Sequence, residues 1–410
     1  MPPGSSPSAV AAVREAAPPA AGAARAEGAA PLRLAFCVLK YFPYGGMQRN
    51  LLRIAQACRA RGHAVEVFAM DWQGARPEGI RVTLLPVRPL LSHRRAPAFA
   101  ARVAPLLSAG GFDAVVGFNK MPGLDVYYAA DPCFLARAQD RNWGYRLTGR
   151  YRQSVAFERA VFAAAAAAEI LLVSSAQQEE FTRCYGTPRE RFHLLPPEIA
   201  ADRVAPRDDG TIRSAVRAEL GVGEDEKLVL LIGSGFKTKG LDRALLALAA
   251  LPAPLRGKTR LVAVGQDNPR PFVRLAKRLG LADRFRIFGG RDDVPQLLLG
   301  GDLLIHPAYM ENTGAILLEA MAAGLPVLAS AVCGYASHVE RSRAGELVSE
   351  PFSQDALDRL LATMLTSPER RSWRENGIAY AKTLAGLSRA RVAADVIEAK
   401  ALAKRAARRP

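Results

Sequence analysis

Short apolar runs alternate with longer amphipathic stretches along most of the chain. Residues 32–39 (LRLAFCVL) form a continuous apolar run, which is typical of a strand buried on both faces. A loop with two glycines follows, then a stretch with apolar residues at helical spacing, and then a second apolar run at 64–70. The order strand, glycine loop, helix, strand predicts one unit of a doubly wound parallel sheet.

The same order continues at 112–119 and 168–175 and starts again after residue 225. Further apolar runs occupy 227–235, 259–266, 284–290, 302–308, 326–332 and 345–350. A segment rich in proline and charge, 195–211, separates the two halves and is expected to be an inter-domain hinge. We therefore predict the α/β class, with two Rossmann-like doubly wound domains that face one another across a cleft.

The expected domains are residues 32–200 and residues 201–375. A C-terminal helix over about 376–400 is expected to pack back on the first domain. Residues 1–31 are dominated by alanine, proline and glycine and are expected to be a disordered tail. This tail lacks the pattern of a secretory signal, and no apolar run reaches the roughly 18 residues that a membrane span needs.

The five cysteines are widely scattered and include no C-x-x-C pair. This distribution is typical of reduced thiols in a cytosolic protein and speaks against a disulfide framework or a zinc site. The formal net charge is +17. A balance this basic indicates an acidic partner, although the composition of the genome is an alternative explanation.

Residues 135–162 interleave arginines with aromatic side chains. This combination predicts contact with an anionic membrane surface, where rings lie at headgroup depth and arginines meet lipid phosphate. An amphipathic core helix with a solvated basic face is the alternative. No sequence feature supports nucleic-acid binding. The candidate membrane-facing residues are Arg141, Trp143, Arg146, Arg150 and Arg152.

Candidate chemistry lies in loops that follow predicted strands. Gly45 and Gly46 precede a helix, where glycine permits close backbone approach and unusual dihedral angles and the first N–H groups attract phosphate. Glycines also occur in such loops for steric reasons alone. Lys239 lies at the corresponding edge of the second domain, where it would be a cation for phosphates or a solvated lysine.

A second glycine lies at the start of a helix in the stretch 306–327, HPAYMENTGAILLEAMAAGLPV. Thr313 is expected to cap this helix, and the N–H groups of Gly314 and Ala315 would then be free to bind a diphosphate. Glu311 and Glu319 are separated by seven residues on either side of this glycine.

This E-x7-E stretch resembles the retaining glycosyltransferases of family 4, which have the GT-B fold. Longer blocks, such as AFCVLKYFPYGGMQRNLLRIA and YRLTGRYRQSVAFERAVF, resemble the lipopolysaccharide core glucosyltransferase I (WaaG or RfaG) group. The resemblance covers roughly residues 32 to 385. It implies transfer of glucose from UDP-glucose to an inner-core heptose through an alpha-1,3 linkage, with the α-configuration retained.

The resemblance also implies roles for individual residues. Gly46 would lie against the donor, Glu311 would bind the hexose and Glu319 the ribose. Asp131 would be the acceptor-side base or an electrostatic aid to the acceptor hydroxyl, although it could instead cap a helix before Pro132. The diphosphate would be held by Arg203 and Lys239, and the full expected donor set is Gly45, Gly46, Arg203, Lys239, Arg291, Glu311, Thr313, Gly314, Ala315 and Glu319.

Three positions depart from the pattern of the family. Thr238 stands where relatives carry an arginine, with Lys237 one position earlier as a possible replacement. Asn50 replaces an aspartate, and Glu198 replaces a glycine, a change expected to affect the hinge more than the chemistry.

No D-x-D motif occurs in the chain, so we expect a metal-independent enzyme with no cofactor besides its substrate UDP-glucose. No carboxylate is convincingly placed as a nucleophile, which favours front-face attack assisted by the leaving phosphate. The expected partners are a nucleotide-sugar donor, a lipid-linked heptose acceptor and an anionic membrane. The expected location is cytoplasmic, peripheral on the inner face of the bacterial inner membrane. A relative that uses another nucleotide sugar, and a non-catalytic nucleotide-sugar-binding protein, remain alternatives.

Overall fold

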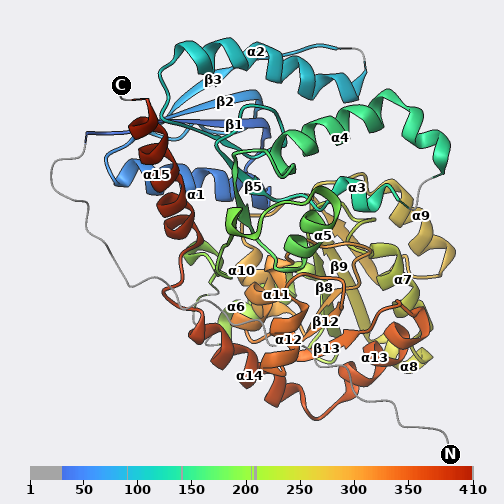
Figure 1. Ribbon diagram of the computed structural model, residues 1–410. Coiled ribbons are helices and arrows are strands. Elements are labelled where there is room, and N and C mark those ends of the chain that lie inside the picture. The colour runs from blue at the N-terminus through green and yellow to red at the C-terminus, as the bar shows by residue number, and fades with distance from the viewer. Residues whose placement is uncertain (1–29, 90, 140–141, 205, 207–209, 409–410) are drawn as a thin grey trace, which may run out of the picture. The chain divides into compact units, whose positions relative to one another are not determined.

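The computed structural model describes residues 30–408, apart from 90, 140–141, 205 and 207–209. The tail expected to be disordered lies outside the described residues, except for its last two positions. The chain from Leu32 onward forms one compact unit. Its described part contains two parallel sheets, one of seven strands and one of six (Figure 1).

The first sheet has the strand order β3-β2-β1-β4-β5-β6-β7, and every neighbouring pair is parallel. The strands are β1 (Arg33–Tyr41), β2 (Ala64–Trp72), β3 (Arg81–Leu84), β4 (Ala114–Gly117), β5 (Val126–Ala129), β6 (Glu169–Leu172) and β7 (Phe192–Leu194). Strands β4 and β6 lie within the predicted apolar runs, and β1 and β2 each extend two residues beyond theirs. Strands β3, β5 and β7 are not among those runs. Strands β4 and β6 are equally short, but each lies inside a longer apolar run that predicts it.

Alternate residues of β1 face two helical layers. Leu34 and Phe36 lie in a core with the first and last helices of the chain, whereas Ala35 and Cys37 lie in a core on the opposite face. The helices around this sheet are α1 (Gly46–Ala60), α2 (Arg95–Ala109), α3 (Phe134–Arg137), α4 (Gly149–Phe162), α5 (Ala176–Tyr185) and α15 (Arg389–Ala407). This layering explains why the β1 run is apolar on both faces.

The second sheet has the order β10-β9-β8-β11-β12-β13 and is also parallel throughout. Its strands are β8 (Lys227–Ile232), β9 (Thr259–Val264), β10 (Phe285–Phe288), β11 (Leu303–His306), β12 (Val327–Ser330) and β13 (Gly345–Val348). All six lie within the predicted runs. The two central strands, β8 and β11, mark the point where the strand order reverses, which is where ligands bind in sheets of this kind.

Helices cover both faces of this second sheet as well. They are α6 (Thr211–Leu220), α7 (Leu241–Ala250), α8 (Ala253–Gly257), α9 (Arg270–Arg278), α10 (Val294–Gly300), α11 (Ala315–Ala322), α12 (Ala336–Ser342), α13 (Gln354–Thr366) and α14 (Arg370–Thr383). The α/β class and the two Rossmann-like domains predicted from the sequence are therefore confirmed.

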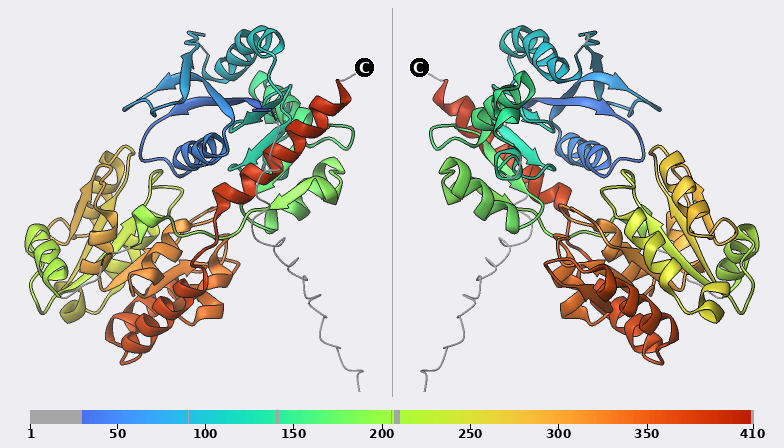
Figure 2. Two further views of the ribbon diagram at one scale, coloured as in Figure 1. Left: turned by 90° about the vertical axis from the view of Figure 1, so that its left-hand side faces the viewer. Right: turned by 90° about the vertical axis from the view of Figure 1, so that its right-hand side faces the viewer.

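The segment expected to form one helix over about 376–400 is in fact two helices. Helix α14 ends at Thr383 and packs on α11 and α12 of the second domain, whereas α15 begins at Arg389 and packs on α1 of the first (Figures 1 and 2). Ala393 and Ile397 of α15 are buried in the core of the first sheet. The break at 384–388 lets the chain return to the first domain.

A buried arginine lies where the chain re-enters that domain. The backbone N–H of Arg389 donates to a carboxylate oxygen of Glu198 at 2.9 Å, and its guanidinium donates to the Tyr335 hydroxyl at 2.5 Å. Glu198 belongs to the predicted hinge, and Tyr335 to the second domain. Glu198, one of the departures from the family pattern, therefore ties the hinge to the start of α15.

Candidate active site

Two loops of the second domain lie side by side because the strands before them, β8 and β11, are neighbours. The backbone N–H of Tyr309 donates to the carbonyl of Thr238 at 2.9 Å. Gly240 has φ of 76°, and a Cβ built there would lie only 2.0 Å from the carbonyl oxygen of Pro307. Only glycine permits this approach, and the approach places Lys239 opposite Glu311.

Lys239 and Glu311 form an ion pair in which both side chains are largely buried. The same carboxylate oxygen of Glu311 lies 3.1 Å from Nε2 of His306, a residue with no exposed surface at the end of β11. A lysine ammonium has three N–H donors. Lys239 can therefore hold Glu311 and still donate to a phosphate oxygen.

These contacts keep Glu311 ionised. Burial acts to raise the pKa of its carboxyl, but the hydrogen bond from His306 and the charge of Lys239 outweigh burial and lower the pKa to about 2. An anionic carboxylate fixed by two donors is suited to accept hydrogen bonds from sugar hydroxyls.

The helix α11 begins just after Glu311. Its N-cap is Gly314, in the left-handed region at φ of 81°. The prediction that Thr313 caps this helix is wrong, because the chain turns at Gly314 and no side chain makes a capping bond. The backbone N–H groups at this end, including that of Ala315, lack a capping side chain, and Glu319 lies on the same helix with 8% of its surface exposed.

The predicted glycine loop of the first domain precedes α1. Gly45 is the N-cap with φ of −81°, so the expected unusual dihedral angle is not observed there. A Cβ at Gly45 would collide with the Gln48 side chain, whereas one at Gly46 would meet nothing within 4 Å. The backbone at Gly46 is therefore open to close approach, as a donor contact requires.

The neighbouring Tyr44 reaches the second domain. A Cβ at Gly290 would lie 3.1 Å from the Tyr44 ring and 3.3 Å from Gln266. Gly290 thus makes room for an aromatic ring from the first domain at the carboxyl ends of β9 and β10. This contact brings the Gly45–Gly46 loop to the same edge of the second sheet as Lys239.

Three further predicted cations have other surroundings. Arg203 is buried at the end of a short 3-10 turn in the hinge. Arg291 donates to Asp293 and Glu219, and these bonds raise the pKa of its guanidinium. Lys237 donates to Asp242 at 2.5 Å and to the Tyr309 hydroxyl at 2.9 Å, so it is held at the rim of the site.

On the acceptor side, Asp131 follows the end of β5 and is exposed. The alternative role as a helix cap is wrong, because the N-cap of α3 is Cys133. The backbone carbonyl of Asp131 accepts from the Gln177 amide at 3.1 Å, and Asn312 donates to the preceding Ala130 carbonyl at 2.6 Å. The structure therefore brings Asp131 next to the loop that carries Glu311.

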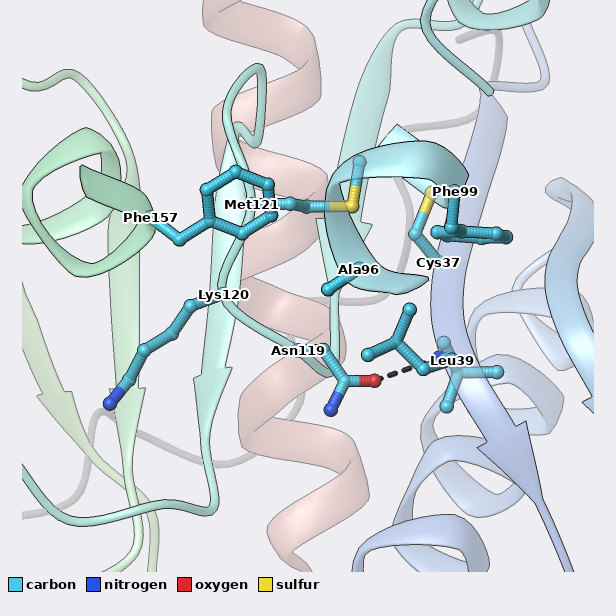
Figure 3. Close-up of a pocket in the computed structure, with 9 residues that line it drawn as sticks. Cys37, Leu39, Ala96, Phe99, Asn119, Lys120, Met121 and Phe157 are labelled. Atoms are coloured by element: carbon cyan, nitrogen blue, oxygen red, sulfur yellow. Dashed lines mark hydrogen bonds between the residues drawn. The ribbon is translucent and has the colours of Figure 1, made fainter. Parts of the chain in front are cut away.

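A fully buried carboxylate fixes the helix that follows Asp131. Glu158 of α4 accepts from the backbone N–H groups of Phe134 and Leu135 at 2.8 and 2.9 Å and from the Tyr185 hydroxyl at 2.7 Å. It also forms an ion pair with Lys120. Figure 3 shows Lys120 directed away from the other side chains around an apolar cavity of about 10 Å³. Such a cavity holds about one water molecule and is a packing void rather than a ligand site.

Comparisons with known proteins agree with this geometry. Residues 44–203 match the family model Glycosyltransferase Family 4, and residues 212–380 match Glycosyl transferases group 1. The chain is 45% identical over 366 residues to the lipopolysaccharide glucosyltransferase WaaG of Escherichia coli (strain K12), which covers 89% of this chain and 98% of that protein. The chain belongs to the WaaG family of glycosyltransferases.

Solved structures support the same assignment. A crystal structure of WaaG, a glycosyltransferase involved in lipopolysaccharide biosynthesis, matches with a TM-score of 0.86 and 44% identity, over 89% of this chain and 99% of that one. Anabaena HepE, solved in complex with UDP and glucose, matches with a TM-score of 0.68 and 21% identity, over 90% and 99% of the chains. The family resemblance and the GT-B fold predicted from the sequence are confirmed.

The predicted membrane-facing residues of this WaaG-family chain lie before and within α4. Trp143 is 77% exposed, and Arg146, Arg150 and Arg152 are exposed as well. Arg141 lies outside the described residues. None of the described helices combines the length and hydropathy needed to cross a bilayer. Within the same described ranges, no group of three or more His, Cys, Asp or Glu side chains is placed to hold a metal ion.

Two residues of the site are absent from the sequence prediction. His306 ends a predicted apolar strand, and a polar residue in that position is a signal that sequence reasoning could have used. Asn312 gives no comparable signal, because its partners lie in the other domain.

Replacing Glu311 by glutamine is expected to change how stability depends on pH. The pKa of Glu311 is about 2 in the folded state and 4.5 ordinarily. The ionised carboxylate therefore stabilises the fold above pH 4.5, and this contribution is lost as the pH falls toward 2. Between pH 6 and pH 3, the wild type should lose about 2 kcal/mol of unfolding free energy relative to Glu311→Gln, as measured by urea unfolding.

The matched control is Glu375→Gln on the exposed face of α14, where the carboxylate is 62% exposed. This variant should follow the wild type at both pH values, because surface ion pairs contribute little. Identical pH dependence in the wild type and in Glu311→Gln would contradict the buried-pair description.

Proposed function

We propose that the chain is a retaining, metal-independent glucosyltransferase that moves glucose from UDP-glucose to an inner-core heptose of lipopolysaccharide. The observation that carries this proposal is the ion pair between Lys239 and Glu311 near the N-terminus of α11, with Glu319 in the helix itself. It occurs in a chain that is 45% identical to a lipopolysaccharide glucosyltransferase over nearly the whole of that protein.

The order of groups along α11 suits a nucleotide sugar. Glu311 in the loop would accept hydrogen bonds from hexose hydroxyls, the N–H groups around Ala315 would receive the diphosphate, and Glu319 would bind the ribose hydroxyls. The rise of an α-helix is 1.5 Å per residue, so Glu319 lies about 6 Å along the helix axis from Ala315, with Glu311 ahead of the helix in the loop. The helix dipole adds to the attraction for phosphate.

Departure of UDP needs positive charge at the leaving oxygen. Lys239 would supply a full charge, and the N-terminus of α11 a partial one. Thr238 adds no charge where relatives carry arginine, and Lys237 is already held by Asp242 and Tyr309. The stabilisation of the leaving group therefore rests mainly on Lys239, and Arg203 is retained as a second candidate cation.

Retention of configuration is proposed to result from front-face attack. The acceptor hydroxyl oxygen bonds to C1 of glucose as the bond from C1 to the phosphate oxygen breaks, and the hydroxyl proton passes to the departing phosphate. In this step Asp131 would orient the acceptor hydroxyl; in the alternative, Asp131 would be the base and take the hydroxyl proton in place of the departing phosphate. Glu311, fixed by Lys239 and His306, would bind the sugar rather than attack it.

We infer that the acceptor is reached at a membrane surface. Trp143 and Leu147 are 77% and 58% exposed, and Arg146 and Arg150 lie beside them. Exposed rings and arginines together suit an anionic lipid interface. This supports a peripheral position on the cytoplasmic face of the bacterial inner membrane, where a lipid-linked heptose is accessible.

The donor assignment is tested by incubating the protein with radiolabelled UDP-glucose, UDP-galactose or GDP-mannose and a heptose-terminated, deglucosylated core lipid. We expect transfer from UDP-glucose, with an α-linked product and an unchanged rate in EDTA. Glu311→Ala should abolish transfer, and Lys239→Ala should lower kcat about 100-fold or more.

Lys258→Ala is the matched control, because this exposed lysine lies beside Asp225, away from the loops that follow β8 and β11. Transfer only from UDP-galactose or GDP-mannose would identify the related enzyme with another donor. Donor binding without any transfer would favour a non-catalytic binding protein.

The membrane surface is tested by sedimentation with vesicles that contain anionic lipid. Arg146→Ala together with Arg150→Ala should weaken binding about 30-fold, since each arginine near the surface contributes about 1 kcal/mol. Arg371→Ala with Arg374→Ala on α14 removes the same charge from the second domain and should leave binding unchanged. Equal weakening in both pairs would show that only net charge matters.

A further inference from the structure

Asn312 lies in the loop 307–314 between β11 and α11, here called the donor loop. It makes two hydrogen bonds to the first domain. Its amide nitrogen donates to the carbonyl oxygen of Ala130 at 2.6 Å and to that of Ala129 at 3.2 Å. A side-chain amide has two N–H donors, so one group can satisfy both carbonyls. These carbonyls lie at the carboxyl end of β5, directly before Asp131.

The turn that Asn312 contacts is also held from within the first domain. Gln177 of α5 is buried, and its amide nitrogen donates to Ala129 at 3.3 Å and to Asp131 at 3.1 Å. Ala129 therefore accepts from both domains. The backbone on either side of Asp131 is fixed by one amide from each domain.

The donor loop is also held by hydrogen bonds within the second domain. The N–H groups of Gly334 and Tyr335 donate to the carbonyls of Glu311 and Thr313 at 3.2 and 2.7 Å. A Cβ at Gly334 would lie 2.0 Å from the Asn312 carbonyl and 3.0 Å from the Ser174 hydroxyl of the first domain. The loop and the first domain thus meet at a position where only glycine fits.

We propose that Asn312 is a positioning residue that sets Glu311 against Asp131. Glu311 precedes Asn312 in the chain, and Asp131 follows its partner Ala130, so the two bonds fix the separation between the hexose-binding carboxylate and the acceptor-side carboxylate. The Asn312 amide N–H groups are engaged by the Ala129 and Ala130 carbonyls in this arrangement. This inference rests on the proposed function for its effect on turnover, but the inter-domain contact itself does not.

The chemistry of the contact predicts different behaviour for two substitutions. Asn312→Ala removes both donors. Asn312→Asp keeps the shape but places a carboxylate against two carbonyl oxygens, which repel it. At low pH the protonated acid regains one donor, so part of the contact is restored.

The first arm of the experiment measures turnover on the full chain with UDP-glucose and deglucosylated core lipid. Asn312→Ala should lower kcat about tenfold, and Asn312→Asp should lower it further, since small displacements of reacting groups cost up to about 100-fold. The dissociation constant for UDP-glucose alone should stay within about twofold. The ratio of Asn312→Asp to wild-type activity should rise as the pH is lowered from 8 to 5.5.

The second arm does not depend on activity. Hydrogen–deuterium exchange is followed in the peptide segments 126–135 and 309–314, which should exchange several-fold faster in both variants. Segment 259–264, in the centre of the second sheet, should be unchanged. Asn376→Ala is the matched control, because the Asn376 amide also donates to a backbone carbonyl, that of Arg343 at 3.0 Å, within the second domain.

Slower turnover with unchanged donor affinity and faster exchange at both segments supports the proposal. Wild-type turnover and exchange in both variants would overturn it. A loss of donor affinity equal to the loss of turnover would also overturn it, because the residue would then support the donor site rather than position its two sides. If the wild type itself transfers no glucose, the proposed function fails, and exchange alone decides whether Asn312 holds the two segments together.

Discussion

The ion pair between Lys239 and Glu311 depends on β8 and β11 being neighbours in a parallel sheet. Parallel strands carry their following loops to one edge, and at the point where the strand order reverses two such loops lie next to each other. Gly240 then allows the loops to touch, since any side chain there would collide with the carbonyl of Pro307. His306, at the end of β11, holds the Glu311 carboxylate through its Nε2 at 3.1 Å.

The first domain supplies the other half of the site through contacts that differ in kind. Tyr44 packs against Gly290, Asn312 donates to the end of β5, and Gly334 lies against Ser174. Arg389 joins the hinge, the second domain and α15 at a separate place. The donor loop is thus connected to the acceptor side directly, whereas Glu198 and Arg389 connect the hinge to the start of α15.

Some of the arginines that give the chain its positive net charge bind acceptors inside the fold. Asp302 is buried and accepts from Arg213, Arg217 and Arg370. Burial acts to raise the pKa of its carboxyl, but the hydrogen bond from the Leu228 backbone N–H and the charges of Arg370 and Arg213 lower it to about 2. Arg191 donates to three backbone carbonyls. The net charge therefore overstates what is available to an anionic partner, and the proposed membrane contact rests on the exposed arginines before and within α4.

Local periodicity was sufficient to predict the second sheet and four strands of the first, because strands buried on two faces are continuous apolar runs. It was also sufficient to place Glu311, Gly314 and Glu319 on one loop and helix. The prediction that Thr313 caps α11 was wrong. The chain makes a left-handed turn at Gly314, which packing of the loop sets rather than capping preference. The role of Asn312 and the pairing of Arg291 with Glu219 depend on residues distant in sequence, which periodicity does not report.

The proposed donor site has hexose, diphosphate and ribose in that order along the loop before α11 and α11 itself. Equilibrium titration of UDP-glucose and of UDP into the wild type, Glu311→Gln and Glu319→Gln tests that order. Glu311→Gln should weaken UDP-glucose about tenfold without weakening UDP, because only the sugar contact is lost, whereas Glu319→Gln should weaken both ligands by a similar factor. Equal weakening of UDP and UDP-glucose by Glu311→Gln, or no effect of Glu319→Gln on either ligand, would contradict the account.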